Sequence, residues 1–558
     1  MAKTLARHGF THVSTFACAL LLILLLVGCG GTSGPAETKR PPAAASDASA
    51  FLVANEEEPD TNDFQCTTIH YTVALNVFDR LVEVTVGKDG VVAVGPSLAE
   101  SWEESDDGRT YTFHLRDGVT FSNGSALTAS DVYYTFVRLL THPDSGNRDI
   151  AEIIEGASAL EAGETDELAG FEILDDLNFT ITLERPFEAF LACISMPGAS
   201  ILDEETTEEA GERFGVDPAC TVGTGPFVFD SWEHGKRMVL VARPDCWSGA
   251  PRSAGLDLRF ITDPEEVCAQ FDAGEFDILD IDDLGNSAEF YIHGDIYQDR
   301  IHEIPQIGIS YIALNEATEP LDDVRVRQAL QLALDRRMLL DVVYSGRGQV
   351  ENGIYSHGLY GFNPDLPEIP FDQQRARELL AEAGHPDGID LTFAVKSSST
   401  QSERTLANQV VDMWGEVGVR ATIEVIDEDE FMRMRKAGEL PCYTATWIAD
   451  YDDPDNYVYT FFGSRENTVY RSLNYPRDEI IDRVRKARMI TDSEARLKEY
   501  QDLEEIIVQE DAAWVPLFSR MRMYVTSERL QGFGCAWNGS VKNVYRTMSV
   551  DGAPADQE

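Results

Sequence analysis

The sequence predicts an α/β protein built from more than one domain. Amphipathic helices and strands alternate after Asp322, which is typical of α/β lobes. The 558 residues are enough for roughly two to four domains with sizeable cores. Hydrophobic residues make up 43% of the chain and charged residues 25%, which is the ordinary balance of a globular protein.

The first fifty residues predict export and a lipid anchor. Lys3 and Arg7 precede an apolar run at 16–27, which is short for a transmembrane span and typical of a signal peptide. The run ends in "LVGC", which resembles the bacterial lipobox, so Cys29 is predicted to carry lipid as the first residue of the mature protein. The alternative is an uncleaved signal anchor with an incidental cysteine. Small and polar residues with proline at 31–50 predict a flexible tether.

The charge narrows the range of partners. A net charge of −52 repels nucleic-acid phosphates and anionic lipid head groups, so we expect no nucleic acid and no contact with the membrane beyond the N-terminal lipid. The folded body is then expected on the extracellular or periplasmic side of the cell membrane, held there by its lipid.

The elements before residue 243 include strands and one clear helix. Apolar and polar residues alternate at 111–121, which predicts a strand. The spacing at 128–140 predicts a helix with Thr128 or Ser130 as its cap. Residues 223–242 predict two antiparallel strands joined by a short turn.

The elements after Asp322 alternate between helices and strands. Each predicted helix places its apolar residues on one face, and the predicted strand alternates apolar and polar residues. The helices are expected at 322–335, 372–384, 406–417 and 497–507, and the strand at 419–427.

Nine cysteines are present, of which Cys18 and Cys29 fall in the N-terminal segment. Export permits disulfides. The hairpin at 223–242 would bring Cys220 and Cys246 near each other, so they are the first predicted pair, with Cys193 as the competing partner. Because no C-x-x-C spacing occurs, the sequence does not predict a zinc ribbon.

The stretch "ATWIADYDDPDNYVY" at 445–459 concentrates negative charge. It holds four aspartates within six positions, namely Asp450, Asp452, Asp453 and Asp455. A calcium loop of the EF-hand type would need glycine where Asp455 stands and glutamate where Phe461 stands. We therefore predict no metal site here.

Signatures of catalysis and of cofactors are missing. The chain has no G-x-S-x-G, no Walker A loop and no H-E-x-x-H, and its histidines are scattered. A second acidic cluster, "DILDIDD" at 277–283, is expected to be an exposed strand end. Paired carboxylates of a hydrolase stay open as an alternative. The sequence predicts a protein that is not an enzyme and needs no cofactor.

Four segments of the chain, taken in order, carry a recognisable pattern. The strongest is "PSLAESWEESDDGRTYTFHLRDGVTFSNGSALTASDVYYTF" at 96–136, and the others lie at 222–232, 322–336 and 448–462. Together they resemble the extracellular solute-binding proteins of peptide-type ABC importers, called family 5. The resemblance extends from about Val73 to Phe533. It implies a protein that captures di- or oligopeptides in a cleft between lobes and delivers them to a permease with its ATPase subunits.

The resemblance also implies a two-lobed periplasmic-binding-protein-like fold of type II, with an extra domain inserted in the first lobe. The expected parts are a signal peptide at 1–28, a lipidated tether at 29–50, a first lobe from 51–78, 217–312 and 525–558, an inserted domain at 79–216 and a second lobe at 313–524.

The resemblance implies a ligand site around Asp450. In peptide binders of the family, an acidic residue just before the D-P segment often meets the ligand's α-amine, and Asp450 stands at the matching position. Trp447 and Tyr451 are expected beside it, and Thr67 and Tyr71 match a segment that often borders the pocket. No residue matches a carboxylate-binding arginine.

The other three aspartates of the stretch, Asp452, Asp453 and Asp455, are expected at the surface, where they would shape and solvate the turn. Three alternatives to peptide import stay open. The same family could bind another solute, such as a nickel chelate, a sugar or an opine. The chain could also be an extracellular Asp-dependent hydrolase, or a receptor that signals without transport.

Overall fold

The computed structural model describes residues 50–550 apart from 87–91, 283, 285–287, 295 and 543. The predicted signal peptide, Cys29 and nearly all of the tether therefore lie outside the described residues. Residues 45–558 form one compact unit. Among the helices that the structure describes, none combines the length and the hydropathy that a membrane span requires.

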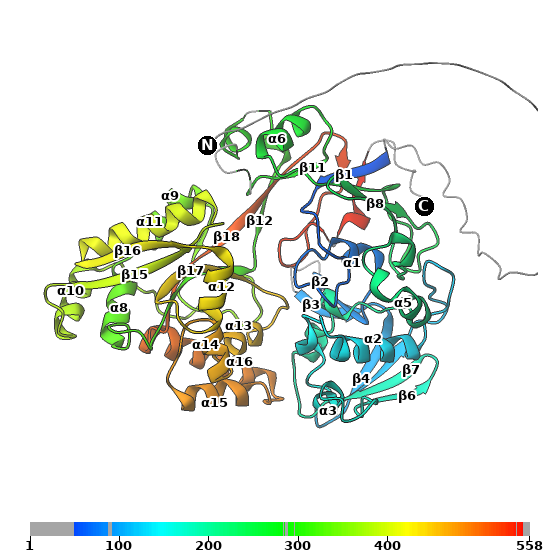
Figure 1. Cartoon of the computed structure of the whole chain (residues 1–558), viewed down its shortest axis with the longest axis horizontal. Coiled ribbons are helices and arrows are strands. Elements are labelled where there is room, and N and C mark those ends of the chain that lie inside the picture. The colour runs from blue at the N-terminus through cyan, green and yellow to red at the C-terminus, as the bar shows by residue number, and fades with distance from the viewer. Residues whose placement is uncertain are drawn as a thin grey trace, which may run out of the picture. The chain divides into compact units, whose positions relative to one another are not determined.

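One mixed sheet of twelve strands runs through both lobes (Figure 1). Its path follows β16 (Val419–Ile426), β15 (Ile389–Lys396), β17 (Cys442–Ile448), β13 (Gly308–Leu314), β18 (Trp514–Thr526), β11 (Ile278–Asp280), β1 (Phe51–Asn55), β10 (Gly255–Arg259), β9 (Arg237–Ala242) and β8 (Phe227–Glu233). Two further strands, β12 (Ile301–Pro305) and β14 (Gly348–Val350), pair with β18. The long strand β18 therefore belongs to both lobes.

The lobes are joined where β12 continues into β13 beside β18. The first half of β18 pairs with β13, and its second half pairs with β11 and β12. Ile312 packs in a hydrophobic core with the helices of the second lobe, whereas Tyr524 packs in a core that includes Leu52 and Phe229 of the first. At the junction of the two lobes, Gln306, which lies between β12 and β13, donates its backbone N–H to the carbonyl oxygen of Arg520 in β18 at 2.9 Å. The domain bounds given above stay a prediction.

A separate four-stranded sheet lies in the lower part of the first lobe in Figure 1. Its order is β4 (Ala99–Glu104), β5 (Thr110–Leu115), β7 (Asn178–Thr182) and β6 (Phe171–Asp175), and a hairpin of β2 (Val82–Val86) and β3 (Val92–Pro96) precedes it. Helix α2 (Ala129–Thr141) begins after Thr128, whose side chain forms a capping box with Asp131. The predicted helix is confirmed, and of the two candidate caps, Thr128 and Ser130, the structure has Thr128 at the N-cap.

The remaining helices of the first lobe are short. They are α1 (Thr72–Val77), α3 (Ala157–Glu161), α4 (Phe190–Cys193), α5 (Glu204–Ala210), α6 (Pro264–Asp272) and α7 (Ala288–His293). The predicted hairpin at 223–242 is confirmed by the antiparallel pair β8 and β9.

The disulfide predicted between Cys220 and Cys246 is wrong, because the structure holds both as free cysteines. Cys220 ends a 3₁₀ turn, and its Sγ lies 3.7 Å from Asp217 Oδ2. Cys246 follows β9 and places its Sγ 3.7 Å from the carbonyl oxygen of Thr224. Although the hairpin is correct, each thiol faces its own local partner. Cys193, the competing partner, is also free and lies in α4.

The helices of the second lobe confirm the predicted amphipathic segments. They are α8 (Val324–Leu332), α9 (Arg336–Tyr344), α10 (Gln373–Glu382), α11 (Gln401–Glu416), α12 (Glu428–Lys436), α13 (Asp455–Phe462), α14 (Arg465–Tyr470), α15 (Asp478–Ala487) and α16 (Ser493–Glu504), the last of which continues as a π-helix over Glu505–Glu510. Fully buried Trp414 and Trp514 lie in the cores that these helices cover.

The sequence predicts an exposed strand end for the acidic cluster at 277–283. This prediction is wrong for Asp277. Asp277 is fully buried and accepts a hydrogen bond from Val53 N at 2.8 Å. Arg529 pairs with the same carboxylate at 2.6 Å. The physical reason is that β11 lies inside the large sheet, between β1 and β18, where an acid needs both a cation and backbone donors.

Candidate ligand-binding cavity

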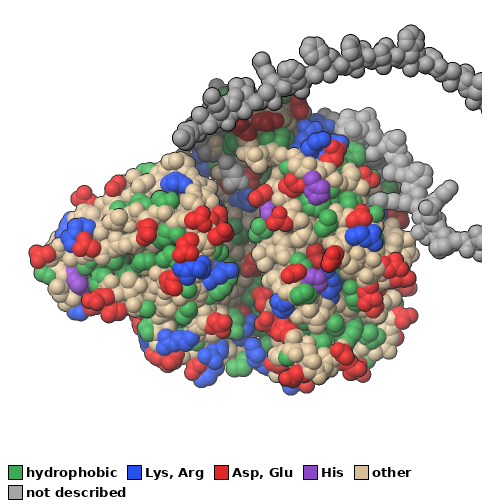
Figure 2. Space-filling view, in the orientation of Figure 1, with side chains coloured by type: hydrophobic (Ala, Val, Ile, Leu, Met, Phe, Trp, Pro, Cys, Tyr) green, Lys and Arg blue, Asp and Glu red, His purple; other side chains and the backbone are tan. Residues whose placement is uncertain are grey.

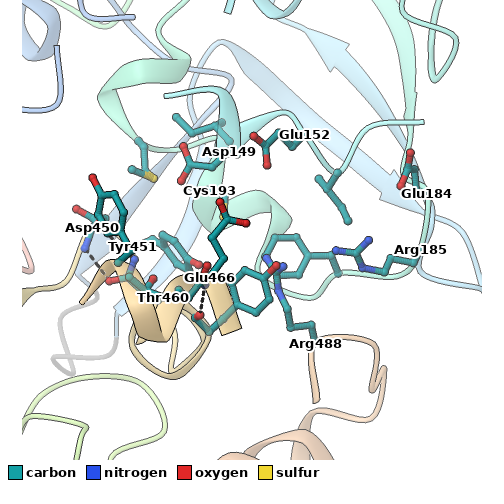
Figure 3. Close-up of a pocket in the computed structure, with 18 of the residues that line it drawn as sticks. Asp149, Glu152, Glu184, Arg185, Cys193, Asp450, Tyr451, Thr460, Glu466 and Arg488 are labelled. Carbon is teal, nitrogen blue, oxygen red and sulfur yellow. Dashed lines mark hydrogen bonds between the residues drawn. The ribbon is translucent and has the colours of Figure 1, made fainter. Parts of the chain in front are cut away.

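A cavity of about 770 Å³ lies between the two lobes, within the size range of small-molecule and peptide sites. One wall comes from residues 149–196 of the first lobe and the other from residues 447–488 of the second. Figure 2 shows a groove between the lobes, and Figure 3 shows the side chains of both walls facing one another.

The turn between β17 and α13 places Asp450 in this cavity. Asn456, in the first turn of α13, reaches back over the turn with its side-chain amide. Its Oδ1 accepts hydrogen bonds from Asp450 N and from Trp447 Nε1, each at 3.1 Å, and its Nδ2 donates to Asp450 Oδ2 at 3.1 Å. One amide thus fixes the backbone and the carboxylate of Asp450 together.

Asp450 is an acid that lacks a cationic partner. No Lys or Arg in the described part of the chain lies within ion-pair distance of its carboxylate. Its side chain remains open to the cavity, while protein surrounds it on the other sides. This burial, and to a lesser degree the charge of Asp149, raise the pKa of Asp450 to about 6, against the opposing effects of Asn456 and Arg471.

Asp453 does not lie at the surface, and that prediction is wrong. Its carboxylate forms a two-point ion pair with Arg496, with Oδ1–Nη2 at 2.6 Å and Oδ2–Nη1 at 2.8 Å. The side chains are only 6% and 1% exposed. The turn directs Asp453 inward onto α16, so the pair fastens the cavity wall to that helix.

The surface prediction is also wrong for Asp455, which is fully buried at the start of α13. Its carboxylate accepts from Tyr500 Oη at 2.8 Å and pairs with Arg488 Nε at 3.1 Å. Asp452 is half-buried and accepts from Tyr360 N at 2.7 Å, which fits the expected role in the turn. Its burial raises its pKa to about 6.

Trp447 and Tyr451 both line the cavity. The guanidinium of Arg471 lies over the Trp447 ring, 4.7 Å from its centre. Tyr451 donates its hydroxyl to Asp455 at 3.2 Å and packs against the hydrophobic core of the first lobe that contains α2. Their place on the wall agrees with the expected site, and their contact with a ligand stays a prediction.

Neither Thr67 nor Tyr71 is among the described residues that line this cavity. The Tyr71 hydroxyl lies 3.0 Å from Asn147 Oδ1, and the Thr67 hydroxyl donates to Ile69 O at 2.6 Å. Burial raises the pKa of Tyr71, and the charges of Asp450 and Asp149 add to the effect. Tyr71 is thus near the acids of the site, behind the wall rather than on it.

The charged residues of the first-lobe wall were not found from the sequence. The lining of the whole cavity holds the carboxylates of Asp149, Glu152, Glu161, Glu184, Asp450 and Glu466, and the guanidinium groups of Arg185, Arg471 and Arg488. Asp149 and Glu152 lie across the cavity from Asp450 and Thr460 (Figure 3). They belong to short turns in a polar segment that has no periodic pattern, so only the fold brings them to the site.

The match to known proteins fits this architecture. Residues 93–468 match the model of the bacterial extracellular solute-binding proteins, family 5. The chain belongs to this family. The resemblance seen in the four sequence segments is therefore confirmed, and family 5 members are substrate-binding proteins of the extracellular or periplasmic space.

Relatives within family 5 carry different ligand names. Di/tripeptide-binding protein 4 of Pseudomonas aeruginosa is 30% identical over 535 residues, which cover 91% of this chain and 96% of that protein. Heme-binding protein A of Haemophilus influenzae is 29% identical over 492 residues, covering 85% and 87%.

Solved structures of the family confirm the two-lobed fold. HbpA2 from Haemophilus parasuis matches with a TM-score of 0.75 and 26% identity, over 90% of this chain and 99% of that one. The periplasmic binding protein DppA from Helicobacter pylori, in complex with the peptide STSA, matches with a TM-score of 0.73 and 24% identity, over 90% and 98%.

Proposed function

We propose that this protein is the lipid-anchored peptide-binding component of an ABC importer. It captures di- or oligopeptides in the cavity between its lobes and delivers them to a permease and its ATPase subunits, without catalysing a reaction. The observation that carries the proposal is Asp450, a fixed acid that has no Lys or Arg partner among the described residues, in a cavity of about 770 Å³. Relatives named as dipeptide- and di/tripeptide-binding proteins support it.

A free α-ammonium group supplies the charge that Asp450 lacks. Every peptide with an unblocked N-terminus has this group, whatever its side chains are. A charge-assisted hydrogen bond to a carboxylate is roughly twice as strong as a neutral one. Asp149 faces the same cavity and strengthens the attraction for a cation.

Heme, the ligand in the name of one relative, fits this cavity less well. The propionates of heme are anionic. The six carboxylates of the described lining outnumber its three arginines, and one of these arginines, Arg488, is already paired with Asp455. The field in the cavity therefore favours cations over a dianionic ligand.

The direct test is the identity of the ligand that accompanies the protein from its host. We expect mass spectrometry of the gently purified, then denatured protein to release short peptides with free N-termini. Recovery of heme, a sugar or a metal chelate in stoichiometric amount, with no peptide, would contradict the proposal.

Arg471 is the best candidate for binding the peptide carboxylate, a role that the sequence did not assign. Its guanidinium lies over the rings of Trp447 and Phe461, at 4.7 and 4.8 Å from their centres. Its Nε is buried without a hydrogen-bond partner, and no acid in the described residues forms an ion pair with it. The aromatic contacts fix the group but leave its charge available to a ligand in the cavity.

We therefore expect Arg471→Gln to weaken the binding of a free dipeptide by about 1.5–3 kcal/mol, or roughly 10- to 150-fold, because it removes a charged hydrogen bond. Binding of the C-amidated dipeptide should change much less. Titration calorimetry with both peptides measures this, and Arg433→Gln, a change on the exposed face of α12, is the matched control. An unchanged preference for the free carboxylate in Arg471→Gln would remove Arg471 from this role.

The lipid anchor is proposed from the "LVGC" sequence, in which Cys29 stands at the cleavage point. We expect Cys29→Ser to accumulate as an uncleaved precursor or to be released from the membrane, because serine lacks the thiol that receives the lipid. Fractionation of cells with detection of the protein in each fraction measures the outcome. A variant that is processed and retained on the membrane like the wild type would show that Cys29 is not the anchor.

A further inference from the structure

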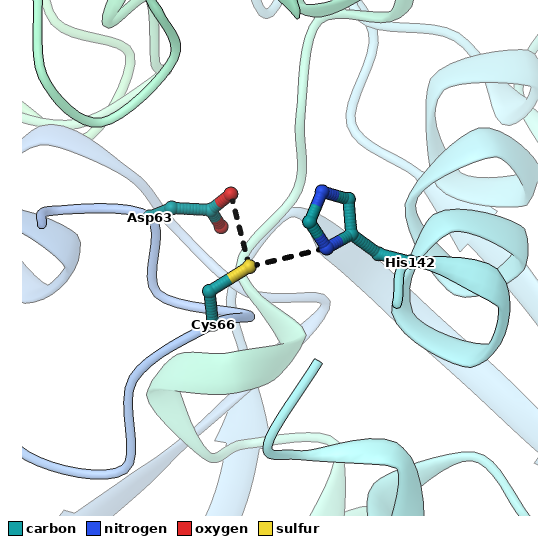
Figure 4. Close-up of side chains that lie close together, drawn as sticks. All are labelled: Asp63, Cys66 and His142. Atoms are coloured by element: carbon teal, nitrogen blue, oxygen red, sulfur yellow. Dashed lines mark hydrogen bonds between the residues drawn. The ribbon is translucent and has the colours of Figure 1, made fainter. Parts of the chain in front are cut away.

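A thiol, an imidazole and a carboxylate meet behind the cavity wall, where the loop before α1 contacts the end of α2 (Figure 4). Cys66 Sγ lies 3.3 Å from Asp63 Oδ2 and 3.3 Å from His142 Nδ1. The three atoms all lie within 4.8 Å of one another. Since 76 residues separate Cys66 from His142, the spacing of cysteines and histidines along the chain gave no indication of this cluster.

The hydrogen bonds show how the lone pairs of the cluster are directed. The backbone N–H of Asp144 donates to His142 Nδ1 at 3.3 Å, so this nitrogen carries its one in-plane lone pair, which an ion would have to take over from that N–H. The thiol of Cys66 donates to Asp63 Oδ2. The only hydrogen between Cys66 Sγ, His142 Nδ1 and Asp63 Oδ2 is therefore the thiol proton.

This donor set suits a zinc-like ion. Zn²⁺ binds thiolate, neutral imidazole and carboxylate, and three protein ligands leave a fourth position for water. The carboxylate is also held in place, because Arg138 Nη2 donates to Asp63 Oδ2 at 2.5 Å and Arg138 Nη1 donates to Gln65 Oε1 at 2.6 Å. Ligating carboxylates commonly receive such a second hydrogen bond.

The charge of Arg138 opposes a cation, so the cluster must gain a negative charge when an ion binds. Without an ion the thiol keeps its proton, which it donates to Asp63 Oδ2. Binding replaces the thiol proton by the metal: Zn²⁺ takes the sulfur lone pair, and one H⁺ leaves to solvent for each ion bound.

We propose that Asp63, Cys66 and His142 form a binding site for a divalent metal ion of the zinc type. The ion fastens the loop that contains Asp63 and Cys66 to the segment that follows α2. The same two segments already meet at Asn147, whose Nδ2 donates to Phe64 O at 3.1 Å and to Thr67 O at 2.7 Å. Asp149 on the cavity wall lies two residues further on. The site would thus stabilise this wall without contacting the peptide.

The test uses the full mature chain, stripped of metal by dialysis against a chelator, and Zn²⁺ in competition with a chromophoric chelator. We expect one Zn²⁺ per chain, and a loss of affinity of about tenfold or more in both Cys66→Ser and His142→Gln. Co²⁺ serves as a second probe, because only a thiolate ligand gives a thiolate-to-cobalt charge-transfer absorption, which Cys66→Ser should abolish. Cys268→Ser, at another partly exposed cysteine, is the matched control and should bind as the wild type does.

Two results would overturn the proposal. The first is the lack of stoichiometric Zn²⁺ binding by the folded wild type. The second is binding that Cys66→Ser and His142→Gln leave unchanged, which would place the ion on the acidic surface instead. Thermal unfolding without metal shows whether a variant has lost its fold rather than a ligand. Since metal binding is measured without peptide, failure here leaves the peptide proposal standing, and the converse also holds.

Discussion

Asp453→Asn is expected to lower the free energy of unfolding by about 3–5 kcal/mol, the typical result of removing one partner from a buried ion pair. Arg496 is only 1% exposed, and both of its terminal nitrogens bind the Asp453 carboxylate. Asparagine retains the shape of the side chain but leaves the guanidinium buried and without a counter-charge. Urea unfolding followed by tryptophan fluorescence measures the change.

Asp478→Asn is the matched control for this experiment. Asp478 also pairs with an arginine, Arg465, at 2.7 Å, but its side chain is 74% exposed. Solvent screens such a pair, so we expect a change below about 1 kcal/mol. A similarly small change in Asp453→Asn would show that the buried pair does not fasten the turn to α16.

Asp450→Asn is expected to reduce the affinity for peptides with a free α-amine by about 2–5 kcal/mol, or roughly 30- to several thousand-fold. Asparagine can keep the contact with Asn456, so the turn should hold its shape while the charge is lost. N-acetylated peptides should bind the wild type poorly, and the variant should discriminate against them less. Titration calorimetry with free and acetylated peptide measures both effects.

The pH dependence of binding gives a second measure of the same contact. Because the pKa of Asp450 in the free protein is about 6, the carboxylate becomes protonated as the pH falls below this value, whereas the ligand's ammonium stays charged. The affinity of the wild type should therefore fall from pH 7 to pH 5, and the Asp450→Asn variant should lack this fall.

The control for both measurements is Asp452→Asn, two residues along the turn. The carboxylate of Asp452 binds Tyr360 N and is not among the residues that line the cavity. The pKa of Asp452 is also about 6, so either acid could cause the pH dependence. If Asp450 causes it, the Asp452→Asn variant should keep the fall in affinity from pH 7 to pH 5. Equal affinity of the wild type for free and acetylated peptide would exclude Asp450 as the amine partner and favour a non-peptide solute.

Interactions between near neighbours along the chain were predictable. Helix α2 begins after Thr128 because that side chain and Asp131 lie three residues apart, and the apolar stripes of α10 and α11 repeat within each helix. The hairpin of β8 and β9 likewise depends on one short turn. The order of residues in "IADYDDPDN" likewise supported the assignment to the family and the expectation that Asp450 lies at the ligand site.

Contacts between distant segments were not predictable. Asp450 and Asp453 are three residues apart in one acidic turn, and nothing in the turn distinguishes their surroundings. One faces an open cavity and the other meets Arg496, 43 residues away. The free thiols of Cys220 and Cys246 show the same limit, since the correct hairpin still leaves each sulfur with a different neighbour.

By itself, the sequence of this protein determined its family and most of its helices and strands. It also predicted export, and it predicted Asp450 as the partner of a peptide amine. The tertiary structure alone decided which acids are buried, that Arg471 lines the cavity without an ion-pair partner among the described residues, and that Cys66 meets His142. The physical reason is that capping and periodicity act over three or four residues, whereas burial and charge pairing depend on which elements pack together.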